Sequence, residues 1–323
     1  MAFEPAPYHA SIVAAPLPAA AYWVRTSDGV RIRVCCWRGG ERGTVVLFPG
    51  RTEYIEKYAD VAGELARCGF GVAAVDWRCH GLSDRLSRNR HVCHVSDFDE
   101  YQRDVAAFMS LLAEVEAPRP WFLLAHSMGG CIGLRALLNG MDVSAAVFIA
   151  PMWRVRMGRV MRHATFVAAR AATWLGLSKR FVAGADHRNH VHYGKSRKIV
   201  LTSDVERFES LRAQIELRPE LSLGGPSYGW VDAALRECRG LLSASPPSCP
   251  ALVFIGTKER VVDRKAVRIV CAKWPAAKVE AVENARHEIL METEAVRDRA
   301  IARIAVFFES CREAGGEGEG SRT

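Results

Sequence analysis

Seven short apolar runs, separated by longer segments with helical periodicity, constrain this chain more than any other feature of its sequence. The runs are VRIRVCCW, TVVLFPG, GFGVAAVD, WFLLAHS, AAVFIAP, ALVFIG and KVEAVENA. A segment between them, FDEYQRDVAAFMSLLAEVEA, repeats apolar residues at helical spacing. Nearly continuous apolar strands that alternate with helices are typical of a parallel sheet covered on both faces. The sequence therefore predicts an α/β fold with a mostly parallel central sheet.

The alternation of strands and helices stops near residue 151 and resumes near residue 241. Between these points, helical segments alternate with loops rich in Gly, Pro and Ser, and no core-type strand is evident. We expect residues 1–150 and 241–310 to form the core. Residues 151–240 are expected to form a cap or lid over the carboxyl ends of the strands, where ligands bind in such sheets. The polar, Gly-rich residues 311–323 are expected to be disordered.

The apolar run WFLLAH ends at Ser127, which is followed by Met128, Gly129 and Gly130 and then by a helical segment. A sharp turn from strand to helix lifts a serine hydroxyl above the sheet. Such a turn accepts only small residues two positions before and two positions after the serine. Those positions hold Ala125 and Gly129. The pattern predicts that Ser127 is a nucleophile at the positive end of a helix.

A serine hydroxyl needs a base that removes its proton and an acid that orients the base. His287 is the only histidine after residue 192, and it follows the acid candidates in the chain order expected for this fold. Glu259 lies in the loop that leaves the run ALVFIG. Asp263 is the alternative acid, although its place before the helical segment RKAVRIVCAKW also suits a helix N-cap. We predict a catalytic set of Ser127, Glu259 and His287.

A site for acyl transfer also needs backbone N–H groups that stabilise an oxyanion. The residue after the nucleophile supplies one of them, so Met128 is the first candidate. The loop after an early strand supplies the second, and Arg51 in the segment FPGR is the candidate there. Gly50 would let this backbone approach a substrate closely. Gly50, Ala125 and Gly129 are thus predicted to support the site.

These motifs together resemble the α/β-hydrolase superfamily, and within it the branch of monoacylglycerol lipases and bacterial lysophospholipases. The matching segments are PGRTEYIEKY, DWRCHGLSD, VSDFDEYQRDV, AHSMGG, GTKERVVD and ARHEILME, with LTSD and GGPSYGW in the expected cap. The sequence departs from the usual pattern where Pro49 replaces a histidine, Ala125 a glycine and Glu259 an aspartate. The resemblance implies an α/β-hydrolase fold with an inserted cap and a serine hydrolase without a cofactor.

The resemblance further implies a carboxylic ester hydrolase that forms an acyl-enzyme on a single-chain lipid, either a lysophospholipid or a monoacylglycerol. Two other functions stay open. Related proline-specific aminopeptidases cleave amides with the same machinery, so a serine peptidase or amidase is one alternative. A protein can also keep this fold as a catalytically silent binding protein. An intact set of Ser127, Glu259 and His287 argues against the silent protein.

The segment MWRVRMGRVMRHATFVAA, in the expected cap, has the pattern of a basic amphipathic helix. Its shared apolar face holds Trp153, Met157, Val160, Met161, Ala164, Val167 and Ala168, while Arg154, Arg156, Arg159 and Arg162 lie off that face. One interpretation is an acyl-binding slot beneath the apolar face, with arginines that contact lipid phosphates or an anionic membrane surface. The simpler interpretation is an ordinary packed helix with a solvated charged side.

Composition adds several exclusions. The net charge of +8 is compatible with anionic partners but specifies none, and no nucleic-acid-binding motif is present. His187, His190 and His192 lie close together in a segment without a nearby cysteine or second carboxylate, so no metal site is predicted. The oligomeric state is not indicated.

The expected location rests on the absence of a long apolar run, on the composition of the N-terminal segment and on cysteine usage. No apolar run is long enough to span a membrane. The chain has no basic residue before Arg25 and several prolines in its apolar N-terminal part, so no secretory signal is expected. Its ten cysteines show no metal-like spacing. We expect a cytoplasmic protein, with a peripheral position at the inner membrane face as an open alternative.

Overall fold

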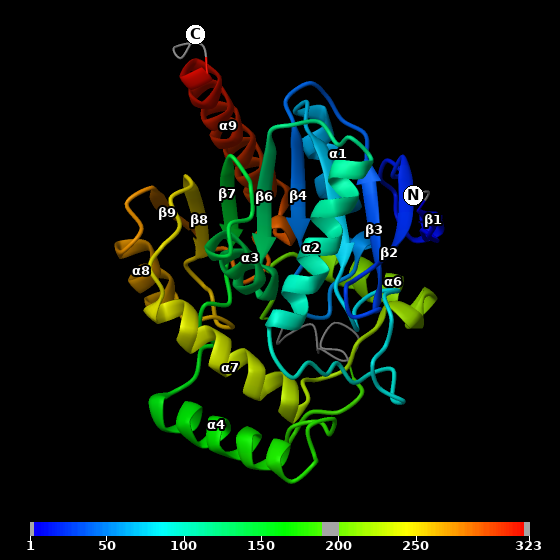
Figure 1. Ribbon diagram of the computed structural model, residues 1–323, viewed down its shortest axis with the longest axis vertical. Helices are drawn as coiled ribbons and strands as arrows, with labels where there is room; N and C mark the ends of the chain where they lie inside the picture. The colour runs from blue at the N-terminus through cyan, green and yellow to red at the C-terminus, as the bar shows by residue number, and fades with distance from the viewer. Residues whose placement is uncertain (1–2, 189–199, 320–323) are drawn as a thin grey trace.

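The computed structural model of the protein describes residues 3–188 and 200–319 (Figure 1). A nine-stranded sheet crosses this part of the chain in the order β1-β2-β3-β5-β4-β6-β7-β8-β9. The strands are β1 (Glu4–Pro5), β2 (Ala20–Arg25), β3 (Arg31–Trp37), β4 (Thr44–Phe48), β5 (Gly71–Asp76), β6 (Trp121–His126), β7 (Ala145–Ile149), β8 (Ala251–Gly256) and β9 (Ala277–Val282). Strands β5 to β9 in this order are parallel, whereas β1, β2 and β3 pair antiparallel at one edge. The predicted α/β fold class is confirmed.

Helices cover both faces of the sheet because its strands are apolar on both sides. In β4, Val46 and Phe48 pack in one core and Val45 and Leu47 in the other, as the period of two in a strand requires. The first face is covered by α2 (Asp99–Glu114), α3 (Met128–Leu138) and α8 (Arg264–Ala272). The second is covered by α1 (Ala59–Arg67) and α9 (Glu294–Glu319), as Figure 1 shows.

A long insertion separates β7 from β8. It contains α4 (Arg159–Trp174), α6 (Val205–Leu217), the short 3₁₀ helix η4 (Pro219–Leu221) and α7 (Tyr228–Ser243). Helix α7 packs against α3 and α8, and α4 packs on α7. Strands β4 and β6 point toward the end of the molecule where α4 and α7 lie (Figure 1). Helix α6 instead packs through Phe208, Leu211 and Ile215 against Tyr54.

A buried ion cluster fixes the loops near the carboxyl ends of β4 and β5. The guanidinium of Arg33, on β3, pairs with Glu56 and Asp76 at 2.7 Å each, and all three side chains are buried. Asp76 also accepts the backbone N–H groups of Ile55 and Leu82 at 2.9 and 2.8 Å. One carboxylate therefore fixes the loop after β4 and the loop after β5 relative to each other.

Two edge strands were missed by the sequence analysis, and the end of the chain was predicted wrongly. The side chains of β1 and most of those of β2 are half-buried or exposed, so these strands lack the fully apolar pattern that marks a core strand. Helix α9 continues to Glu319, where disorder was expected from residue 311. A helix that is already docked extends at little cost per residue, and an ion pair at 2.6 Å between Glu309 and Arg312 supports this extension.

The predicted cap helix differs from expectation in start and orientation. Helix α4 begins at Arg159, and Trp153 instead lies fully buried in the core, where its indole N–H donates to the Gly130 carbonyl at 3.0 Å. Ala169 and Ala172 are the buried residues of α4. The larger apolar side chains Val160, Met161, Val167 and Trp174 are exposed, and Val160 is 85% exposed. Within α4, the face that was expected to cover an acyl slot, with Val160, Met161, Ala164, Val167 and Ala168, is exposed to solvent instead.

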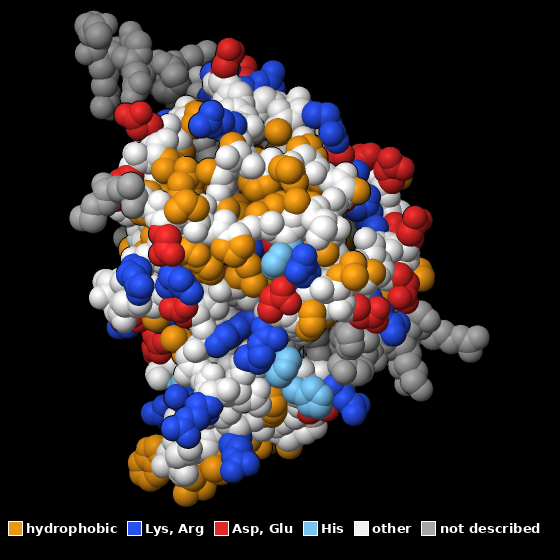
Figure 2. All heavy atoms as spheres, turned by 90° about the vertical axis from the view of Figure 1, so that its right-hand side faces the viewer, with side chains coloured by type: hydrophobic (Ala, Val, Ile, Leu, Met, Phe, Trp, Pro, Cys, Tyr) orange, Lys and Arg blue, Asp and Glu red, His pale blue; other side chains and the backbone are white. Residues whose placement is uncertain are grey.

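Hydrophobic side chains are consequently visible at the surface where α4 lies, at the lower end of the molecule, next to lysine and arginine side chains (Figure 2). None of the helices formed by residues 3–188 and 200–319 has the length and hydropathy that crossing a bilayer requires.

Candidate active site

Ser127 occupies the turn between β6 and α3 in a strained conformation. Its φ of 50° lies in the left-handed region, which a residue with a side chain adopts only when its surroundings impose it. The Ser127 N–H donates to the Ile149 carbonyl at 3.1 Å, and its carbonyl accepts the N–H groups of Gly130 and Met152 at 3.0 and 2.8 Å. These three bonds fix the backbone, so the hydroxyl has a defined position above the sheet.

Small residues on either side of Ser127 permit this turn. A Cβ atom on Gly129 would lie 2.1 Å from the Phe48 carbonyl oxygen, so no side chain fits there. Ala125, where glycine is usual in the resembling family, faces Gly133 of α3, and a Cβ on that glycine would lie 3.4 Å from the Ala125 Cβ. Helix α3 therefore carries a glycine where it faces the extra methyl group.

Ser127, His287 and Glu259 form a continuous hydrogen-bonded chain. The His287 Nε2 atom lies 2.9 Å from the Ser127 hydroxyl, and its Nδ1 atom lies 2.7 Å from Oε2 of Glu259. Ser127 is 9% exposed, and Glu259 and His287 are 3% exposed. The geometry fits a hydroxyl that donates to Nε2 and an Nδ1–H that donates to the carboxylate. This is the arrangement that a base-activated serine needs.

The environment of Glu259 keeps its carboxylate charged. Its other oxygen, Oε1, accepts the backbone N–H groups of Val261 and Val262, the latter at 3.1 Å. Burial alone would raise the pKa of Glu259. The hydrogen bond and charge of His287, together with the two N–H groups, outweigh burial and hold the pKa below its ordinary value. Glu259 can therefore stabilise a protonated His287.

Asp263, the alternative acid, has other partners. It is the N-cap of α8, where one oxygen accepts the Lys265 N–H at 2.9 Å, and its second oxygen lies 2.8 Å from Nε of Arg154. Burial opposes these contacts, yet they hold the pKa of Asp263 below its ordinary value. The structure thus brings Glu259 to His287 and places Asp263 at a helix end.

The two predicted oxyanion donors are Met128, at the N-terminus of α3, and Arg51, in the loop that follows β4. Met128 is the first residue of α3, where backbone N–H groups have no partner within the helix. Within the part of the chain that the structure describes, the backbone N–H groups of Met128 and Arg51 meet no backbone acceptor. The Gly50 N–H differs, since it donates to the carboxylate of Glu53. Gly50 thus anchors the loop that presents Arg51.

A buried charged cluster behind the site was missed by the sequence analysis. The carboxylate of Glu53 accepts from Lys57 Nζ at 2.7 Å and from the Tyr58 hydroxyl at 2.6 Å, and it lies 3.0 Å from Nδ1 of His126. Lys57 also pairs with Glu288 at 2.8 Å. Burial would lower the pKa of His126, but the charge of Glu53 raises it above its ordinary value. The cluster joins the loop after β4, the elbow and the histidine loop.

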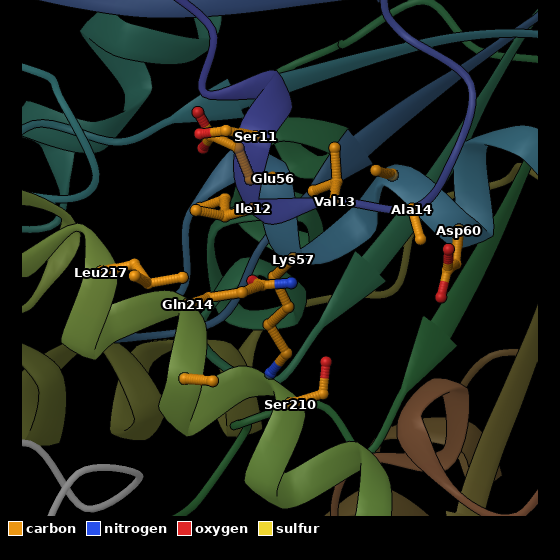
Figure 3. A pocket seen from close by; sticks show the side chains of 12 residues that line it. Ser11, Ile12, Val13, Ala14, Glu56, Lys57, Asp60, Ser210, Gln214 and Leu217 are labelled. Carbon is orange, nitrogen blue, oxygen red and sulfur yellow. The ribbon is translucent and has the colours of Figure 1, made fainter.

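A sequence signal for this cluster exists. His126 ends an otherwise apolar strand and Glu288 follows His287, so each flanks a predicted catalytic residue. A buried titratable group requires a partner, which in this case is Glu53 or Lys57. Lys57 also lines a cavity of about 350 Å³ with Ser11 and Gln214 (Figure 3). Neither Ser127 nor His287 lines that cavity.

Of the histidine-rich segment, His190 and His192 lie outside the described residues. Among the residues that are described, no three His, Cys, Asp or Glu side chains are arranged to hold a metal ion.

Comparison with known proteins places this geometry in context. Residues 39–294 match the profile of the family described as serine aminopeptidase, S33. The chain is 33% identical over 299 residues to lysophospholipase L2 of Escherichia coli K12. The alignment covers 87% of this chain and 85% of that protein. The chain is 27% identical over 271 residues to a probable lysophospholipase L2 of Haemophilus influenzae, covering 83% and 84%.

Solved structures agree on the fold. A soluble variant of monoglyceride lipase from Saccharomyces cerevisiae superposes with a TM-score of 0.71 at 19% identity, covering 94% of this chain and 100% of that chain. A carboxyl esterase from Bacillus coagulans superposes with a TM-score of 0.70 at 15% identity, covering 90% and 98%. The resemblance to α/β-hydrolases that the sequence motifs carried is confirmed.

Proposed function

The chain belongs to the serine aminopeptidase S33 family of α/β-hydrolases, and we propose that it hydrolyses carboxylic esters of single-chain lipids through an acyl-enzyme on Ser127. The observation that carries this proposal is the buried hydrogen-bonded chain from Ser127 through His287 to Glu259. A chain of this kind serves nucleophilic catalysis and needs no cofactor.

The proposed mechanism assigns one role to each group. As the Ser127 oxygen attacks the ester carbonyl, Nε2 of His287 takes its proton, and Glu259 stabilises the imidazolium that forms. The N–H groups of Arg51 and Met128 stabilise the oxyanion of the tetrahedral intermediate. His287 then returns its proton to the leaving alcohol. A water molecule, activated by the same base, releases the fatty acid and restores Ser127.

Relatives and local charge favour a lipid ester over an amide. Two relatives that match over most of the chain are named lysophospholipase L2 and probable lysophospholipase L2, although the family description names an aminopeptidase. A peptidase for free amino termini needs carboxylates near the scissile bond to bind the substrate ammonium. The proposed oxyanion loop instead carries the cation Arg51, which would repel the ammonium group of such a substrate.

Arg51 also favours a phosphate-bearing substrate over a neutral monoacylglycerol. Its guanidinium donates to the Gly224 carbonyl at 2.8 Å and lies 5.0 Å from the Trp230 ring, so it bridges the loop after β4 and the insertion. Burial lowers the pKa of Arg51, and its Nε atom is buried with no partner among the described residues. Arg51 is half-buried and pairs with no carboxylate among the described residues, and a substrate phosphate would supply an anion for it.

Substrate selection by purified protein tests this proposal. We expect a long-chain lysophospholipid to be hydrolysed faster than the matched monoacylglycerol, with short esters slower and a proline amide untouched. Arg51→Gln keeps the backbone N–H but removes the cation. It should lower kcat/KM for the lysophospholipid about tenfold more than for the monoacylglycerol. Arg180→Gln, a change on the exposed surface of the insertion, is the matched control. Cleavage of the proline amide alone would establish the peptidase alternative instead.

Helix α4 supports a second part of the proposal, namely transient docking on an anionic membrane surface. Val160 is 85% exposed and Trp174 is 90% exposed, and both lie on an outward stripe with Ala164, Val167 and Ala171. Arginines of the same segment lie beside this stripe, and the surface there mixes hydrophobic and cationic side chains (Figure 2). An apolar stripe flanked by arginines suits the interface of an anionic bilayer, where single-chain lipids reside.

The state of the cysteines supports a location. All ten cysteines lie in the described part of the chain and are free thiols, which suits a reducing compartment. We therefore propose the cytoplasmic face of a membrane as the working position of the protein.

Vesicle binding by α4 variants tests the docking surface. Val160→Ser combined with Trp174→Ser should weaken binding to phosphatidylglycerol-containing vesicles by at least about tenfold, because each large apolar side chain contributes roughly 1.5–3 kcal/mol when buried. Higher salt should weaken binding of the unmodified protein. Val306→Ser removes an exposed apolar side chain of α9 and should leave binding unchanged. Equal binding by all three proteins, measured by vesicle sedimentation, would contradict docking through α4.

A further inference from the structure

A second cavity, separate from the candidate active site, lies between α4 and α7. Its volume is about 310 Å³. It is lined by Arg154, Arg159, Arg162, His163, Phe166, Leu235, Cys238, Arg239 and Leu242. None of Ser127, Glu259 and His287 is among these residues. Four arginines and a histidine around one small cavity make a strongly cationic wall.

Most of this positive charge lacks an acidic partner. Of the four lining arginines, only Arg154 pairs with a carboxylate among the described residues, namely Asp263 at 2.8 Å. Arg162 donates from Nη2 to the Met157 carbonyl at 2.8 Å, and its Nε atom is buried without a partner among those residues. Helix α4 contains no acidic residue. The like charges repel one another, so the cavity favours an anion.

The acidic residues of α7 do not neutralise the cavity. Asp232 lies within 3.3 Å of Arg170 and Arg236, and Glu237 pairs with Arg135 of α3 at 2.7 Å. Neither these arginines nor the two carboxylates line the cavity, and each carboxylate is engaged outside it.

The start of α4 adds a further positive contribution. Gly158 is the N-cap of this helix and has no side chain that could accept the N–H groups of the first turn. Arg159 follows it directly. A helix of this length carries a partial positive charge at its N-terminus, and an anion at that end is stabilised by it.

The base of the cavity is apolar. Leu235 and Cys238 are buried, and Phe166 lies beside them in the lining. The guanidinium of Arg239 lies 4.6 Å from the Phe166 ring, which holds this cation over the hydrocarbon surface. Arg159 and Arg239 are exposed at the rim. A cationic rim above an apolar base is suited to a ligand with an anionic head and a hydrocarbon chain.

We propose that this cavity binds a single-chain anionic amphiphile, with its carboxylate or phosphate head on the arginines and its chain over Phe166 and Leu235. The ligand class is independent of the reaction at Ser127. A fatty acid and a lipid phosphate monoester share the chemistry that the cavity recognises.

The cavity is connected to the loop that carries Glu259. The Asp263 N–H donates to the Arg154 carbonyl at 2.8 Å, and the Arg156 N–H donates to the Val261 carbonyl at 2.9 Å. The Arg156 side chain also donates to the Glu259 carbonyl at 3.2 Å. An anion that binds Arg154 therefore contacts a segment that is hydrogen-bonded directly to the loop of the proposed catalytic acid.

Equilibrium binding of decanoate and decyl phosphate, each below its critical micelle concentration, tests the proposal. Arg159→Gln combined with Arg239→Gln removes two exposed cations and should raise Kd at least about tenfold for one or both ligands. Arg180→Gln removes an exposed cation elsewhere in the insertion and should leave Kd unchanged. Binding in the candidate active site is common to all three proteins and cancels in the comparison.

Comparison of the two head groups identifies the preferred anion. Two further probes test the anionic head and the hydrocarbon chain separately. Decanoate bound more tightly than decyl phosphate identifies a fatty acid as the source, and the reverse order identifies a phosphate monoester. Inorganic phosphate and uncharged decyl maltoside should both bind at least tenfold more weakly than the preferred amphiphile. Equal binding by the double variant, or by either probe, would overturn the proposal.

Discussion

Replacing Ser127 with alanine is expected to lower kcat for a long-chain lysophospholipid by roughly 10⁴- to 10⁶-fold, the loss typical when a serine nucleophile is removed. The Ser127 hydroxyl lies 2.9 Å from Nε2 of His287, and alanine offers that base nothing to deprotonate. His287→Ala should cause a loss of similar size, because the two residues act as a unit and their effects do not add. Steady-state hydrolysis assays measure both losses.

The alanine variant should fold normally, so its inactivity would report chemistry. The backbone hydrogen bonds that hold Ser127 do not involve its side chain, and alanine meets the same backbone strain at a φ of 50°. We expect the free energy of unfolding to change by no more than about 1 kcal/mol. Ser210→Ala, a serine in α6 outside the site, is the matched control. A long-chain fluorophosphonate should label the wild-type protein and the Ser210 variant but not the Ser127 variant. Undiminished hydrolysis by Ser127→Ala would require another nucleophile.

The fold was predictable because the information is local. A strand buried on both faces must be apolar throughout. The buried strands β4, β5, β6, β7 and β8 are therefore recognisable in the sequence as apolar runs. The elbow was predictable for the same reason, since steric limits at Gly129 act within one turn of chain. The strands β1 and β2 face solvent in part, and their pattern is therefore weaker.

Features that depend on distant partners were not predictable. The outward direction of Val160 and Trp174 depends on which face of α4 packs on α7, and an amphipathic pattern in one helix does not specify its neighbour. The Glu53 cluster likewise joins residues from three segments of the chain, and only their proximity in the fold makes them partners. Charged residues in apolar surroundings indicate that partners exist, but not which residues they are.

The choice between Glu259 and Asp263 leads to the second large expected effect. Glu259→Gln should lower kcat by roughly 10⁴-fold, as loss of the acid does in other triads. Glutamine has nearly the same shape, but its amide cannot stabilise a protonated His287, and an N–H at this position would favour the wrong histidine tautomer. Glu259→Asp should lose an intermediate amount, about ten- to a hundredfold, because the shorter side chain withdraws its carboxylate from Nδ1 of His287.

Asp263→Asn is the matched control for this experiment, since it removes the neighbouring carboxylate by the same chemical change. Asparagine is as good an N-cap as aspartate, and the partly exposed pair with Arg154 contributes no more than about 1 kcal/mol to folding. We therefore expect a small loss of stability and kcat within a few-fold of wild type. If Asp263→Asn were inactive and Glu259→Gln active, the acid would be Asp263, and the loop that bears both residues would have to rearrange before the reaction. If both were active, His287 would act without an acid.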